Sequence, residues 1–156
     1  MIAILSLGAC GKDNGVDYCD NHYGFHTDHL DTIAELSIEL TDSGDLDGRL
    51  MMPQAVFGDM AESDIRKLLG DAESTFVLQS EVPCRISVTN ISSTDRKFEA
   101  QYAANCGTDN KLGRISVTLF DQLDGLEEVV ASVTTSATSK RFAISRQCDA
   151  PIFRLD

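Results

Sequence analysis

The sequence predicts a mainly β domain: an antiparallel sandwich or partly open barrel of seven to eight strands, with one or two short helices. Short segments in which apolar and polar side chains alternate recur along the chain, and this alternation is typical of half-buried strands. Most are separated by tight-turn residues, which favours an antiparallel sandwich or barrel. The 156 residues match one ordinary domain, and 42% hydrophobic residues suffice for a core.

The first predicted hairpin covers residues 34–52. Its first strand alternates four apolar residues with polar ones, namely Ala34, Leu36, Ile38 and Leu40. Residues 42–45, with the sequence Asp-Ser-Gly-Asp, provide turn chemistry. We expect residues 46–52 to return as the second strand, which Pro53 ends because proline cannot donate a hydrogen bond to a sheet.

A short helix is predicted next, over residues 63–69. Ser63 is its expected N-cap, Asp64 favours the first turn, and Gly70 ends it. Three apolar residues fall on one side of this helix, namely Ile65, Leu68 and Leu69. The helix is therefore expected to pack against a sheet, and residues 75–79 to form the strand that follows.

A second hairpin is predicted from residues 84–91 and 97–106, with turn residues 92–96 between them. When the hairpin is folded about Asp95, opposed residues segregate into an apolar face and a mostly polar face. The apolar pairs are Ile86 with Ala104 and Val88 with Tyr102, and the more polar pairs are Ser87 with Ala103 and Thr89 with Gln101.

The same register predicts a disulfide, because it places Cys84 opposite Cys106. Directly opposed residues of an antiparallel pair lie about 4.5–5.5 Å apart, which is within disulfide reach. One register therefore satisfies both the bridge and the burial pattern. The open alternative is that the cysteines are reduced, buried thiols.

The remaining segments complete the set of strands. A third hairpin is predicted from residues 114–120 and 127–135, each with apolar alternation, joined by a loop that carries Asp124 and Gly125. Residues 140–147 are expected to add a strand. A final apolar stretch at residues 152–155 closes the chain.

The N-terminal segment is an apolar run with a specific ending, Leu7, Gly8, Ala9 and Cys10. This ending resembles the lipobox of bacterial lipoproteins, although no Lys or Arg precedes the run. The resemblance implies acylation of the Cys10 thiol and cleavage before it. Gly11 stands where Asp is the inner-membrane retention residue of the enterobacterial pattern, which implies the outer membrane, facing the periplasm. The alternative is a buried first strand of a cytosolic domain.

This interpretation divides the chain into three parts: a signal remnant at residues 1–9, a tether with a His-rich segment at 10–30, and a single β-rich domain at 31–156. It also bears on the five cysteines. With Cys10 acylated, four remain, the even number that an oxidising compartment favours. By subtraction, Cys19 then pairs with Cys148.

All three histidines of the chain, His22, His26 and His29, lie in the predicted tether. On a helix they share one face, where they could bind zinc or copper together with Asp28. The spacing matches no recognised metal motif, and Gly24 weakens a helix. The alternative is a polar segment that its aromatic residues hold against the sheet.

Composition narrows the functional classes. A formal net charge of -12 argues against nucleic acid or an anionic lipid surface as a direct partner. The chain contains no nucleophile elbow, phosphate-binding loop or dinucleotide fingerprint. We therefore expect a lipid-anchored envelope protein without a cofactor, a non-enzymatic accessory, assembly or binding module for a protein partner or an apolar ligand. The alternative is a metal-binding or hydrolytic envelope protein that uses His22, His26 and His29.

Overall fold

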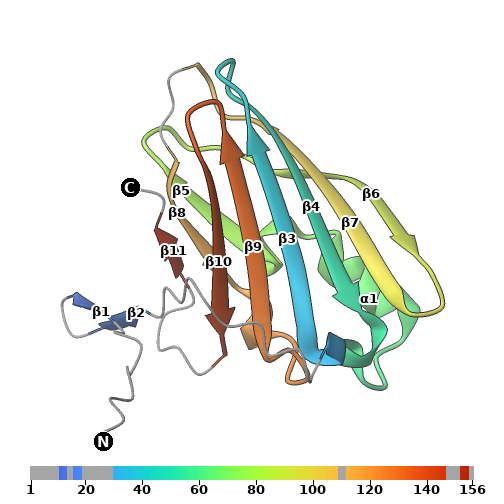
Figure 1. Cartoon of the computed structure of the whole chain (residues 1–156). Helices are drawn as coiled ribbons and strands as arrows, with labels where there is room; N and C mark the ends of the chain where they lie inside the picture. Colours follow the sequence, from blue (N-terminus) through green and yellow to red (C-terminus); the bar gives the residue numbers. More distant parts are fainter. Residues whose placement is uncertain (1–10, 14–15, 19–29, 109–111, 147–151, 155–156) are drawn as a thin grey trace, which may run out of the picture.

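Six strands form the larger of two sheets, in the order β10-β9-β3-β4-β7-β6 (Figure 1). The computed structural model describes residues 11–13, 16–18, 30–108, 112–146 and 152–154. All neighbours in this sheet are antiparallel except β3 and β9, which are parallel, so the sheet is mixed. The strands are β3 (Ile33–Leu40), β4 (Asp45–Pro53), β6 (Ser87–Ser93), β7 (Lys97–Asn105), β9 (Glu128–Thr135) and β10 (Ser139–Ser145).

A smaller antiparallel sheet packs against one face of the larger one. Its order is β11-β8-β5, with β5 (Phe76–Ser80), β8 (Leu112–Val117) and β11 (Ile152–Arg154). Two further strands, β1 (Gly11–Asp13) and β2 (Val16–Tyr18), pair only with each other among the described strands. The mainly β fold is confirmed: β3 to β10 supply eight strands, the upper end of the prediction, and the short β11 adds a ninth to the smaller sheet.

The core lies between the two sheets, because the alternation of each strand turns its apolar residues inward. On β3 and β4 the burial alternates residue by residue, and Ile38 and Leu50 are at most 1% exposed. From the smaller sheet, Phe76 and Ile115 are equally buried. The sandwich therefore has one shared core, to which both sheets contribute.

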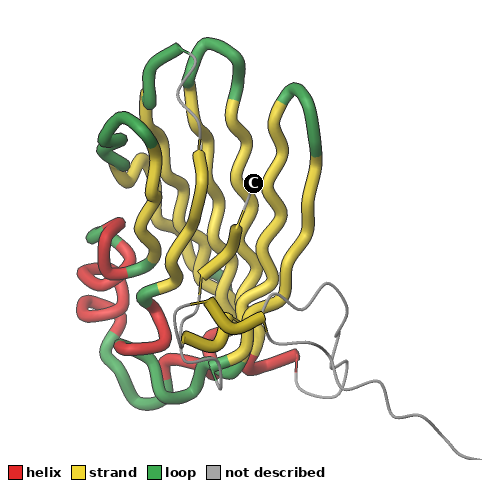
Figure 2. Tube along the Cα trace, turned by 90° about the vertical axis from the view of Figure 1, so that its left-hand side faces the viewer, coloured by secondary structure: helices red, strands yellow, loops and turns green. Residues whose placement is uncertain are grey.

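The helical segments gather at one end of the strands, away from the β3–β4 turn (Figures 1 and 2). They are α1 (Glu62–Leu69) and the 3-10 turns η1 (Leu30–Thr32), η2 (Gln54–Phe57), η3 (Ala72–Ser74) and η4 (Leu119–Asp121). Helix α1 buries Ile65 and Leu69 and ends at Gly70, as predicted. Its N-cap is Ala61, so the prediction of Ser63 as N-cap is wrong. Ser63 lies inside the first turn because the chain enters the helix earlier.

The β3–β4 hairpin has the predicted strands and turn, with Leu40 opposite Leu46. The β6–β7 hairpin follows the predicted register at Ser87 and Val88. Beyond Val88 the register shifts, so that Asn90 and not Thr89 lies opposite Gln101. A β-bulge at Thr89 explains the difference, since a bulge inserts one extra residue in one strand of a pair.

The predicted hairpin of residues 114–120 and 127–135 is wrong, because β8 and β9 belong to different sheets. β9 pairs instead with β10 and, in parallel, with β3. The physical reason lies in the connection, where four apolar side chains are buried and form part of the core at the end of the sandwich. These are Leu119, Phe120, Leu123 and Leu126. A segment so buried is not a hairpin turn but a crossing from one sheet to the other.

Candidate functional site

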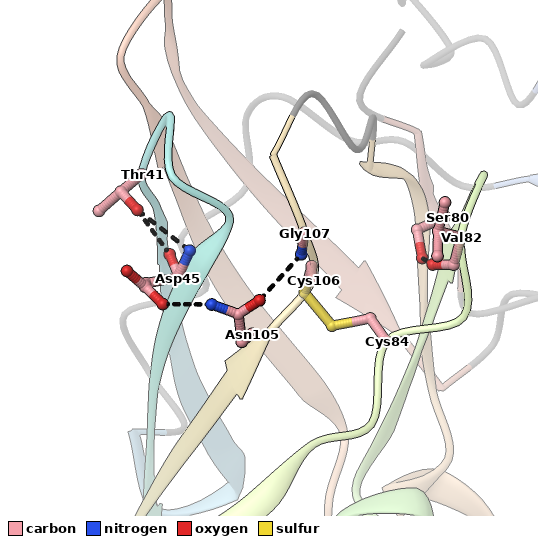
Figure 3. Close-up of a disulfide and its surroundings, with 8 residues drawn as sticks. All are labelled: Thr41, Asp45, Ser80, Val82, Cys84, Asn105, Cys106 and Gly107. Atoms are coloured by element: carbon pink, nitrogen blue, oxygen red, sulfur yellow. Dashed lines mark hydrogen bonds between the residues drawn. A yellow bond between two sulfur atoms is a disulfide. The ribbon is translucent and has the colours of Figure 1, made fainter.

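A disulfide joins Cys84 to Cys106, as the hairpin register predicted (Figure 3). Cys106 directly follows β7, and Cys84 lies in the segment that connects β5 of the smaller sheet to β6 of the larger one. The two Cα atoms are 4.7 Å apart. Cys106 is only 5% exposed, so the bridge fastens the connecting segment to the end of the larger sheet.

The disulfide is part of a junction with the β3–β4 turn (Figure 3). The Cys106 N–H donates to the Gly44 carbonyl at 2.7 Å. Asn105 donates from Nδ2 to Oδ1 of Asp45 at 2.7 Å, and its own Oδ1 accepts from the Gly107 N–H at 3.2 Å. Three segments distant in sequence are thus held together by one covalent bond and two hydrogen bonds, while the third hydrogen bond, from Gly107 to Asn105, orients the Asn105 side chain.

The chemistry of this junction is structural. A thiolate is the reactive form of cysteine, and a disulfide contains none. The bridge instead restricts the unfolded chain, by a loop whose ends are 22 residues apart. Structural disulfides in general persist in oxidising compartments, since glutathione and thioredoxin keep most cytosolic thiols reduced.

The other predicted site residues lie outside the described residues. They are the lipidation residue Cys10, the pair Cys19 and Cys148, and the histidines His22, His26 and His29. Lipidation, the second disulfide and the metal site therefore stay predictions. Within the part of the chain that the structure describes, no three His, Cys, Asp or Glu residues are grouped to hold a metal ion. In the same part, no helix is long and apolar enough to cross a membrane.

The outer face of the larger sheet carries an excess of negative charge beside the β3–β4 turn. Glu39 on β3 lies directly opposite Asp47 on β4, and both are exposed. Asp45 is exposed at the same end of β4. Like charges directly opposed across a strand pair are destabilising. This end of the face is therefore better suited to a cationic neighbour than to an acidic one.

An ion pair lies further along the same face. Arg49 on β4 donates from Nη2 to Oε2 of Glu99 on β7 at 2.6 Å. This hydrogen bond, with a second from Gln101, lowers the pKa of the Glu99 carboxyl. The Arg49 side chain is 52% exposed, so solvent screens the pair and its contribution to stability is small.

The free edge of β6 is blocked by contacts that sequence reasoning missed. Arg66 on α1 donates from Nη1 to the Ile91 carbonyl at 3.0 Å and from Nη2 to Oγ of Ser93 at 3.4 Å. Glu62 holds the same guanidinium at 2.9 Å. Together with the bulge at Thr89, these contacts prevent a regular strand from pairing along this edge.

Strand β5 has a different edge. It pairs with β8 on one side, and none of the other described strands pairs with it on the second side. Its sequence, Phe-Val-Leu-Gln-Ser, contains neither a charge nor a proline. The sequence carried this signal, but only the structure shows that β5 is an edge strand.

No protein-family model matches the chain, and no curated protein matches it.

Proposed function

We propose that the protein is a lipid-anchored component of the bacterial cell envelope, in the outer membrane facing the periplasm, where it acts as a non-enzymatic accessory, assembly or binding module. The observation that carries the proposal is the Cys84–Cys106 disulfide, since structural disulfides are typical of exported proteins. The lipobox residues that end at Cys10 independently favour an exported protein. Acyl chains on Cys10 would hold the protein at the membrane, and the β domain would recognise its partner.

A protein partner is the occupant that the packing favours over an apolar ligand. The space between the sheets is filled by the protein's own side chains: Leu119 and Leu126, at the closed end, are at most 1% exposed. Ile144 and Ala131, from β10 and β9, are fully buried. Recognition is therefore assigned to the outside of the sandwich. Delipidated protein that carried an extractable apolar molecule would contradict this assignment.

The decisive experiment is intact mass spectrometry of the chain isolated from a native bacterial membrane fraction. The expected mass is that of a chain that begins at Cys10 and carries acyl groups. Alkylation is expected to add nothing before reduction and to label the four remaining cysteines after it. The matched control is the Cys10→Ser variant. It should no longer be found in the membrane fraction, and its disulfides should be intact. An unacylated chain with four free thiols would overturn the proposal.

A further inference from the structure

We infer that the free edge of β5 is the docking edge of this protein, and that it receives an extended strand of a protein partner that carries basic residues among its apolar ones. The inference rests on the proposed function, of which it names the recognition surface and the chemistry of the partner. It is carried by the contrast between β5 and the other strand edges of the sandwich.

One side of the sandwich is closed by its own strands. β10, the edge of the larger sheet, carries Lys140 and Arg141, and β11, the edge of the smaller sheet, contacts it (Figure 1). Charged residues and a neighbouring strand are two of the ways in which proteins protect a sheet edge. This side is therefore poorly suited to strand addition.

On the opposite side the two edges are unequal. The edge of β6 is bulged at Thr89 and capped by the guanidinium of Arg66, as described above. No such cap covers β5 in the described part of the chain, and its pairing with β8 is regular from Phe76 to Gln79, with a register shift only between Gln79 and Ser80. In an antiparallel strand every second residue directs its N–H and C=O to the same side. The second side of β5 thus presents backbone donors and acceptors that only another extended chain can pair regularly.

Side chains beside this edge suit an apolar residue of the incoming strand. Val77 is 36% exposed, one of three large apolar residues exposed in the described structure. It faces away from the core, because its neighbour Phe76 is buried at 1% exposure. Gln79 shares the outer face with Val77. An apolar side chain opposite Val77 would gain burial that the isolated protein does not provide.

Charge selects the rest of the partner's chemistry. The ends of β5 are bracketed by Glu73 and Glu81, both exposed, and the whole chain has a net charge of -12. A second copy of the chain would bring the same negative charge to the contact. A strand with lysine or arginine residues would instead be steered towards the edge and held by its two carboxylates.

The test uses the purified full chain and three synthetic peptides whose terminal charges are removed by chemical blocking groups. The first alternates lysine and valine, the second alternates glutamate and valine, and the third is the first with a central proline. The lysine–valine peptide is expected to slow amide hydrogen exchange in residues 76–80 while leaving residues 87–93 unchanged. Its affinity should fall as salt is raised, because exposed charges are screened. Proline should abolish binding because it removes a backbone donor.

Matched variants locate the contact. Val77→Lys is expected to weaken the binding of the lysine–valine peptide by roughly tenfold or more, because it places a like charge on the edge and removes the apolar contact. Ser92→Lys makes the same change in charge on the blocked edge of β6 and should have no effect. Gln79→Lys serves as a second variant on β5, so that one misfolded protein does not decide the result.

Three outcomes would overturn the inference: no exchange protection of β5 by the lysine–valine peptide, equal binding of the glutamate–valine peptide, or dimerisation of the chain itself through β5, seen by sedimentation. The outcome is separable from that of the proposed function. The peptide experiment reports on the edge whether or not Cys10 is acylated, and the mass measurement reports on the anchor whether or not β5 binds a strand.

Discussion

Phe76 and Tyr102 meet edge to face between the two sheets, with ring centroids 5.2 Å apart and ring planes at 83°. Phe76 belongs to β5 and Tyr102 to β7, so the contact joins the edge strand of the smaller sheet to the larger sheet. Pairs in this geometry contribute about 0.5–1.5 kcal/mol beyond their buried area. The Tyr102 hydroxyl also donates to the Leu69 carbonyl at 3.4 Å, which ties α1 to the same point.

The first prediction concerns alkaline pH. Burial raises the pKa of Tyr102 from 10.0 to about 12, against a smaller opposing effect of its hydrogen bond with Thr75. Because the pKa is raised in the folded state, the stabilisation is fully present below pH 10 and is lost as pH rises towards 12. The free energy of unfolding should fall by about 1.4 kcal/mol per pH unit in this window from this residue.

The measurement is urea unfolding of the wild type and Tyr102→Phe across that pH range. The variant should be about 1 kcal/mol less stable at neutral pH, where it lacks the hydroxyl's hydrogen bond. It should also lose less stability than the wild type at alkaline pH, so that the two curves converge and then cross before pH 12. Parallel curves would contradict the assignment of the raised pKa to Tyr102.

The second prediction compares two glycines that meet at the disulfide junction. Gly44 and Gly107 both have positive φ, at 85° and 80°. A Cβ on Gly44 would lie 2.2 Å from the Gly107 carbonyl oxygen, whereas a Cβ on Gly107 would meet no atom within 4 Å. Gly107→Ala should therefore lower the free energy of unfolding by about 1 kcal/mol, because alanine disfavours a positive φ. Gly44→Ala should lower the free energy of unfolding clearly more, because the backbone of Gly107 must also move to make room for the Cβ. Equal thermal midpoints for the two variants would contradict the close approach.

The third prediction concerns the Glu99 carboxyl, whose pKa is lowered first by the hydrogen bond from Arg49. Arg49→Gln should raise that pKa towards its ordinary value. Carbon-detected NMR of the Glu99 carboxyl measures the change as a function of pH. A lowered carboxyl pKa gives stability that is present above the unfolded pKa and is lost as pH falls through the folded pKa. The matched control, Lys97→Gln, also removes one positive charge, but from β7, the strand of Glu99 itself, and should shift the pKa of Glu99 less. An equal shift would show that general charge, and not the hydrogen bond, lowers the pKa.

The parts of the fold that the sequence predicted correctly depend on nearby residues. The β3–β4 hairpin follows from alternation on both sides of a four-residue turn. The Cys84–Cys106 bridge follows from a register that spans 22 residues. In the β3–β4 hairpin the turn determines which residues face each other, so a local pattern suffices. In the β6–β7 hairpin the predicted register holds at Ser87 and Val88, on the cysteine side of the bulge, and not next to the turn.

The missed parts depend on which sheet a strand joins. Alternation on β8 and β9 looks the same whether the two pair with each other or lie in opposite sheets. The parallel pairing of Ile33 with Glu128 joins segments far apart in the chain, and parallel strands share no tight turn that would reveal them. For the same reason the edge position of β5 could not be predicted, although its lack of charge is visible in the sequence.

The last prediction tests what the disulfide contributes. Replacing both cysteines, as Cys84→Ala with Cys106→Ala, removes a closed loop whose ends are 22 residues apart. Alanine is chosen because Cys106 is 5% exposed and serine would bury a hydroxyl. The chain-entropy description gives a loss of about 3 kcal/mol in the free energy of unfolding.

Urea unfolding measures this loss, and its slope gives a second readout. Without the bridge the unfolded chain exposes more surface, so the dependence of the free energy on urea should become steeper while the midpoint falls. The control is Ser92→Ala, an exposed position on β6 between the two cysteines, which leaves the covalent loop intact and should change neither the midpoint nor the slope. A midpoint and slope equal to those of the wild type would show that the hydrogen bonds from Cys106 to Gly44 and from Asn105 to Asp45 hold the junction without the covalent bond.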